Sequence, residues 1–242
     1  MPVLSVDGLS LVDILLLGVI IIGLPLEALI NLKSARAELA SGKPGVRVKH
    51  YTQTILLLWG ISLPIIVLWA SSGRAWAELG FDLNMSDWAF SGWVLAALIA
   101  AFFALQFAQV TRSESVRTQI RDHMSKNTIM ANFMPHTDEE RRVFNLMGVS
   151  AGIAEEIVFR GYLIWAFGLF MPIWSAAALA LVVFTVLHSY QGWSQLPGVL
   201  AMGALVTLVF LLSGSIWPAI AVHIFVDVIN NGTVCRARMQ TV

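Results

Sequence analysis

Six ionisable side chains lie in otherwise apolar stretches of the second half of the chain. In chain order they are Glu155, Glu156, Arg160, His188, His223 and Asp227. An ionisable group surrounded by apolar sequence is expensive to bury in a membrane, so each one is a candidate functional residue. Carboxylates and imidazoles are also the side chains that activate water, either as general bases or as ligands of a metal ion.

The two adjacent glutamates should have different roles. Glu156 and Arg160 are four residues apart, so on a helix they share a face and can form an ion pair. Glu155 points about 100° away from Glu156 around the helix axis. We therefore expect Glu156 and Arg160 to support the geometry of the site. Glu155 has no partner on its own helix, so it needs partners from other helices, water or an altered pKa.

Two chemistries could use these residues. In the first, Glu155 is a general base that takes a proton from water with help from His188. His223 and Asp227, one helical turn apart, then polarise or hydrogen-bond the scissile carbonyl. In the second, His188, His223 and either Glu155 or Asp227 bind Zn²⁺, which activates the water. The chain has no His-Glu-x-x-His segment, so we assign no metal or other cofactor and keep zinc as the alternative.

Structural explanations exist for the same residues. A histidine in a membrane helix can serve only as a hydrogen-bond partner, and Glu-Glu with a following Arg can be a packing network. A proton or ion path would use the same residue types. The catalytic interpretation is favoured because all three groups occur in the last four apolar segments, whereas the first three carry no comparable set.

The composition indicates a polytopic α-helical membrane protein. Of the 242 residues, 57% are hydrophobic and 12% are charged, against about 45–50% apolar and about 25% charged in a soluble domain. Equal numbers of basic and acidic residues, 15 each, argue against a nucleic-acid partner. The single cysteine, Cys235, excludes an internal disulfide and a cysteine-rich zinc site.

About seven segments are long and apolar enough, or nearly so, to cross the bilayer. They are residues 10–32, 53–71, 88–110, 143–167, 171–188, 195–213 and 215–232. Their continuous apolar runs lack the alternation of a β-barrel. The last four segments are expected to form a catalytic four-helix core.

The positive-inside rule gives an orientation for these seven spans. Most basic residues fall in the loops 33–50 and 111–142 and in the C-terminal tail. With seven spans, both basic loops and the basic tail lie on the same side of the membrane, which is the cytoplasmic side. This predicts an external N-terminus and a cytoplasmic C-terminus. We expect the membrane to be the inner (plasma) membrane of a bacterium.

Four regions follow from this pattern. Residues 1–110 hold three N-terminal transmembrane helices, and residues 233–242 form a cytoplasmic tail. Residues 111–135 form a cytoplasmic connector, in which apolar residues recur with helical spacing from Arg112 to Met134, as in one amphipathic helix on the membrane surface. Residues 136–232 form the core, and Thr137 with Glu140 predicts a capping box where its first helix begins.

The three groups of ionisable residues resemble the motifs of the CAAX-protease and bacteriocin-processing family of intramembrane proteases, also called the CPBP or Abi family. The segments that carry the resemblance are Glu155-Glu156-x-x-x-Arg160, Phe184-x-x-x-His188 and His223-x-x-x-Asp227. The resemblance covers about residues 135–232. The occurrence of all three motifs in this order is a specific signal, whereas any one alone is weak.

The resemblance implies an endopeptidase whose site lies within the membrane and opens to the cytosol. Its substrate would be a hydrophobic or membrane-associated peptide or protein, and the lipid bilayer its other partner. Glu155 would be the catalytic base, His188 would help to activate water and His223 would act on the oxyanion. Asp227 stands where prenyl-protein proteases often have Asn, so it could orient His223, bind a metal or carry a raised pKa. The alternative is a non-catalytic immunity or scaffold protein that binds a peptide or a membrane partner.

Overall fold

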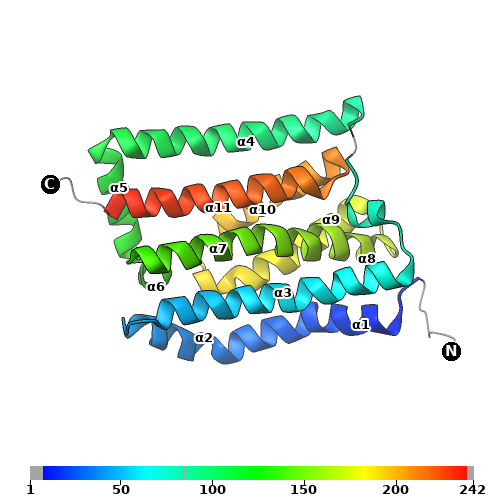
Figure 1. The fold of residues 1–242 in the computed structure, drawn as a ribbon, viewed down its shortest axis with the longest axis horizontal. Helices are drawn as coiled ribbons and strands as arrows, with labels where there is room; N and C mark the ends of the chain where they lie inside the picture. Colours follow the sequence, from blue (N-terminus) through cyan, green and yellow to red (C-terminus); the bar gives the residue numbers. More distant parts are fainter. Residues whose placement is uncertain (1–7, 84, 239–242) are drawn as a thin grey trace.

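The computed structural model describes residues 8–83 and 85–238, and within them it contains helices and no β-strand. The long helices lie side by side with nearly parallel axes, and the start of α1 and the end of α11 lie at opposite ends of the bundle (Figure 1). In Figure 1 the helices α1–α2, α3, α7, α11 and α4 form the nearer layer, and α9 and α10 lie behind them.

The elements follow one another along the chain with short connections. They are α1 (Leu11–Gly18), the π-helix η1 (Val19–Gly23), α2 (Leu24–Ala40), α3 (Val46–Ser72), the 3₁₀-helix η2 (Trp76–Leu79), α4 (Asp87–Arg112), α5 (Glu114–Lys126), α6 (Thr128–Phe133), α7 (Asp138–Glu155), the π-helix η3 (Glu156–Leu163), α8 (Ile164–Gly168), α9 (Ile173–Leu187), the 3₁₀-helix η4 (His188–Gln191), α10 (Leu196–Ser213) and α11 (Ile216–Arg238). Two rods contain a π-helical segment between α-helices, namely residues 11–40 and 138–168.

Within the described residues, six helices are long and apolar enough to cross a membrane. They are Leu11–Ala40, Val46–Ser72, Trp88–Arg112, Ile173–Gln191, Leu196–Ser213 and Ile216–Arg238. The rod of residues 138–168 is not among these six, but it runs alongside α3 and α11 between them (Figure 1). About seven membrane helices, as the sequence predicts, is therefore consistent with the fold.

A buried ion pair joins α1 to the segment between α3 and η2, and two side chains of the rod of residues 138–168 contact it. The carboxylate of Asp13 is fully buried and accepts hydrogen bonds from both terminal nitrogens of Arg74, at 2.9 and 2.6 Å. The Tyr162 hydroxyl donates to the same carboxylate at 3.1 Å. The guanidinium of Arg74 also lies 4.5 Å from the ring centre of Trp165. This network fastens three segments that are distant in the sequence.

The amphipathic stretch is two helices rather than the one expected from Arg112 to Met134. At Asn127 the backbone leaves the helical region (φ −109°, ψ 84°), and this residue separates α5 from α6. Its side-chain oxygen accepts a hydrogen bond from the backbone N–H of Met130 at 3.2 Å. Asn is a favoured N-cap because its side chain satisfies such an N–H, so it starts a new helix here.

The connector is attached to the bundle at both ends. Hydrogen bonds from Arg121, and then from Arg117, hold the pKa of Glu114 down to about 2. Arg121 also donates to the carbonyl of Ala237 at 2.8 Å, and Arg238 donates to the carbonyl of Pro135 at 2.7 Å. These bonds fix the connector against the last helix, which runs on to Arg238 through most of the expected tail. Residues 239–242 of that tail and residues 1–7 of the first region lie outside the described residues.

The rod of residues 138–168 begins where the sequence predicts. Thr137 and Glu140 form both hydrogen bonds of the capping box, and α7 starts at Asp138. Gly152 then lets α7 approach α11 closely. A Cβ atom on Gly152 would lie 2.5 Å from Cγ1 and 2.9 Å from the backbone nitrogen of Ile224. Because Ile224 directly follows His223, this contact sets how closely the glutamates and His223 can approach.

We expect Gly152→Ala to destabilise the protein, because the added methyl group meets backbone that cannot move without separating the two helices. Overpacking of this kind typically costs about 1–3 kcal/mol. Thermal unfolding of the purified protein in detergent measures the effect. Gly60→Ala is the matched control, because a Cβ there meets nothing within 4 Å. Equal stability of the two variants would contradict the close packing at Gly152.

Candidate active site

The site residues come from three elements that meet in the interior of the bundle. Glu155 ends α7 and Glu156 begins the π-helix η3, His188 follows the last residue of α9, and His223 lies in α11. The rod of residues 138–168 contacts both α9 and α11, so all three meet around the glutamate pair. The structure thus brings together residues that are up to 68 positions apart in the sequence.

Glu155 faces both histidines. Its Oε2 atom lies 3.8 Å from Nε2 of His188 and 3.9 Å from Nε2 of His223. The three side chains are only 13–14% exposed. These distances are too long for direct hydrogen bonds.

Glu156 is fully buried and bridges two helices. Its Oε1 atom accepts a hydrogen bond from Nη1 of Arg160 at 2.8 Å and one from Nδ1 of His223 at 2.6 Å. The ion pair with Arg160 is the one that the spacing predicts. The bond to His223 was not foreseen, and it means that Glu156 also orients an imidazole of the site.

Arg160 uses all of its nitrogens. Besides the bond to Glu156, Nη2 donates to the carbonyl of Gly203 at 3.0 Å, and Nε donates to the hydroxyl of Thr207 at 3.3 Å. The guanidinium carbon lies 4.6 Å from the ring centre of Phe184. Arg160 therefore connects its own helix to α9 and α10. Thr207, a polar residue in an apolar helix one turn from a glycine, is the sequence signal that could have revealed this contact.

The hydrogen bonds of the histidines define which nitrogen is free. Nδ1 of His188 lies 2.8 Å from the carbonyl oxygen of Phe184. Since a carbonyl only accepts, Nδ1 carries the proton and Nε2 presents a lone pair toward Glu155 in the neutral ring. The Phe184 and His188 rings also lie 4.2 Å apart at their centres. His223 is oriented in a similar way: its Nδ1 atom donates to Glu156, and its Nε2 atom is directed toward Glu155.

Asp227 lies at the edge of the site. Its Oδ2 atom is 3.8 Å from Nε2 of His223, and 36% of its side chain is exposed. A Cβ on Gly148 would lie 3.2 Å from Cβ of Asp227, so this glycine leaves room for the aspartate. His223 donates its orienting hydrogen bond to Glu156 rather than to Asp227.

The zinc alternative requires donor atoms that can converge on one ion. Both Nε2 atoms and the Glu155 carboxylate are groups that zinc binds. Among the residues that the structure describes, however, no group of three or more His, Cys, Asp or Glu side chains could hold a metal ion.

The fold and this cluster define the class of protein: a polytopic helical membrane protein with a Glu–His–His group between its helices. Residues 141–229 match the family model described as type II CAAX prenyl endopeptidase Rce1-like. All six ionisable residues lie within that match, and the resemblance that the motifs indicate is confirmed. At this coarse level the match supports a membrane-embedded protease. No curated protein and no solved structure matches the chain.

We expect Arg160→Ala to destabilise the fold, because it leaves the buried Glu156 carboxylate with one partner fewer. Breaking a buried ion pair typically costs about 3–5 kcal/mol. Arg141→Ala is the control, since its pair with Asp138 at 3.0 Å is exposed and should contribute no more than about 1 kcal/mol. Thermal unfolding compares the two. Wild-type stability with lost activity would instead place Arg160 in substrate binding.

Proposed function

We propose that the protein is an intramembrane endopeptidase that cleaves a peptide bond with a water molecule activated by Glu155 and His188. The observation that carries the proposal is the position of Glu155, whose Oε2 atom faces two imidazole nitrogens at 3.8 and 3.9 Å. Residues 136–232 are the proposed proteolytic core, and they include the region that matches the family model.

The attacking water lies between Glu155 and His188 in this proposal. Nε2 of His188 accepts one hydrogen bond from the water, and Glu155 accepts the other. As the water oxygen bonds to the scissile carbonyl carbon, its proton moves to Glu155. Glu155 is suited to this step because Arg160 pairs with Glu156 instead. The Glu155 carboxylate therefore has no guanidinium partner among the described residues and can accept the proton.

His223 supplies the charge stabilisation. With a proton on each nitrogen, the ring donates Nδ1–H to Glu156 and Nε2–H to the oxyanion that forms on the carbonyl oxygen. The proton on Glu155 then passes to the leaving nitrogen as the C–N bond breaks, which yields a carboxylic acid and an amine. Asp227 stands next to Nε2 of His223 and favours the doubly protonated ring, so we assign it a positioning role.

The proposed substrate is a hydrophobic or membrane-associated peptide or protein, since the site lies between apolar helices. The proposed orientation has the N-terminus outside and the C-terminus in the cytoplasm of a bacterial plasma membrane. The basic residues of the loop 33–50 and of the connector support it, because such residues concentrate on the cytoplasmic side.

Glu155→Gln should abolish proteolysis and leave the fold intact, because the amide keeps the shape of the side chain but cannot accept the proton. Loss of a general base typically lowers the rate by roughly two to four orders of magnitude. New protein termini in host membranes, compared between cells with wild type and with the variant at equal expression, measure the activity and identify the substrates.

Glu139→Gln is the matched control, because Glu139 lies on the same helix and is exposed. Termini that appear with wild type and Glu139→Gln, but not with Glu155→Gln, support the proposal. Identical termini in all three, with the variant still performing the cellular role, would contradict it. That result would favour the alternative of a non-catalytic immunity or scaffold protein.

A further inference from the structure

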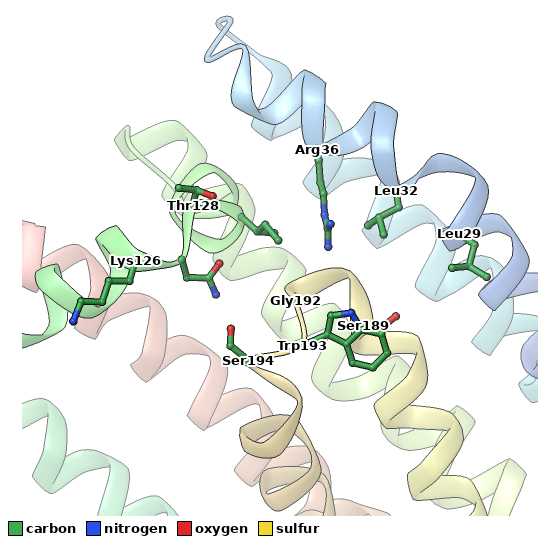
Figure 2. A pocket seen from close by; sticks show the side chains of 11 residues that line it. Leu29, Leu32, Arg36, Lys126, Thr128, Ser189, Gly192, Trp193 and Ser194 are labelled. Atoms are coloured by element: carbon green, nitrogen blue, oxygen red, sulfur yellow. The ribbon is translucent and has the colours of Figure 1, made fainter.

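A cavity of about 460 Å³ lies at the end of the bundle where the connector meets the helices. It is bounded by α2, by the junction of α5 and α6, and by the segment that follows His188 (Figure 2). In Figure 2, Arg36 extends from α2 toward the loop that carries Trp193. The lining residues are Leu29, Leu32, Arg36, Lys126, Asn127, Thr128, Ile129, Ser189, Gly192, Trp193 and Ser194.

Two hydrogen-bond donors that line this cavity are buried without a partner in the described residues. They are Nε of Arg36 and Nδ2 of Asn127. An unpaired buried donor is destabilising, and more so when it is charged, so such atoms are usually matched by a group from outside the chain. Within the described residues, Arg36 makes one hydrogen bond, from Nη2 to the carbonyl of Tyr190 at 3.2 Å.

The charge of the cavity selects an anion. Arg36 and Lys126 both line it, and none of its lining residues is acidic. Neither cation has a carboxylate within ion-pair distance among the described residues. Hydroxyl groups of Thr128, Ser189 and Ser194 add further donors to the same lining.

The remaining wall is apolar and faces outward. Leu29 is 67% exposed and Trp193 is 83% exposed, and Leu32 and Ile129 complete this wall. Exposed Trp at the end of a membrane helix is typical of the boundary between headgroups and acyl chains. A cavity that combines unpaired cationic donors with an exposed apolar rim fits an amphiphile with an anionic head.

We propose that this cavity binds the phosphate headgroup of an anionic phospholipid, with its acyl chains along Leu29 and Trp193. A phosphodiester offers several acceptor oxygens to the guanidinium of Arg36 and the amide of Asn127. Basic pockets between membrane helices on the cytoplasmic side are suited to such headgroups. The inference is independent of proteolysis. Since Ser189 and the Tyr190 carbonyl directly follow His188, a bound lipid would also hold the segment that carries this histidine.

Native mass spectrometry of the purified full-length protein tests the proposal, with phosphatidylglycerol and phosphatidylcholine competing in mixed detergent micelles. We expect preferential retention of phosphatidylglycerol. Arg36→Gln and Asn127→Asp should each weaken it about tenfold or more, as for loss of one charge-assisted hydrogen bond. Asn127→Asp retains the side-chain oxygen that caps α6 and replaces the inward amide donor with a negatively charged acceptor, so it tests the site even if Arg36→Gln fails to fold.

Lys33→Gln is the matched control, because it removes the same charge from an exposed position on the same helix. Equal retention of the two lipids, or equal loss in Lys33→Gln and the cavity variants, would overturn the proposal. Two further probes are inorganic phosphate and a short peptide with a free or an amidated C-terminus. Stabilisation of the protein by inorganic phosphate but not by phosphatidylglycerol would indicate that the cavity binds a soluble anion, which would overturn the proposal. Stabilisation of the protein by the peptide with a free C-terminus, but not by the amidated peptide or the lipid, would indicate a peptide site, which would also overturn the proposal.

Discussion

The buried carboxylate of Glu156 is the point on which the arrangement of the core depends. It has no exposure to solvent, and one of its oxygens receives both the guanidinium of Arg160 and the imidazole of His223. Through Arg160 it also reaches Gly203 and Thr207 on α10. A carboxylate buried in this way is tolerated only when charged and polar groups contact it, and here both of its donors share Oε1. The helices that supply these partners are therefore held at fixed positions around it.

This constraint explains how two neighbouring glutamates can differ in chemistry. Glu156 is occupied by two donors, and Glu155, about 100° around the helix, faces two Nε2 atoms across gaps of 3.8 and 3.9 Å. One carboxylate supplies rigidity and the other remains available to a reacting molecule. Gly152 contributes from one turn earlier, because its missing side chain lets α7 approach the backbone beside His223.

Much of this could be predicted from the sequence because periodicity and burial cost act locally. The apolar segments, the capping box at Thr137 and the pair of Glu156 with Arg160 all depend on spacing along one helix. The break at Asn127 was missed because helical spacing of apolar residues continues across it, while the cap depends on one side-chain bond. The hydrogen bonds from His223 to Glu156 and from Tyr162 to Asp13 could not be predicted, since they depend on how separate helices pack.

The π-helical segment from Glu156 to Leu163 has a consequence for comparing sequences. Hydrogen bonds in a π-helix span five residues rather than four, so such a segment is typically an α-helix with an added residue. Glu155 lies before the added length, and Tyr162, which reaches Asp13, lies near its end. A relative whose helix is α-helical throughout would have one residue fewer between the position of Glu155 and the position of Tyr162. A single-residue gap in an alignment at this place would then record a change of helix type while the glutamate pair and the outer anchor are both preserved.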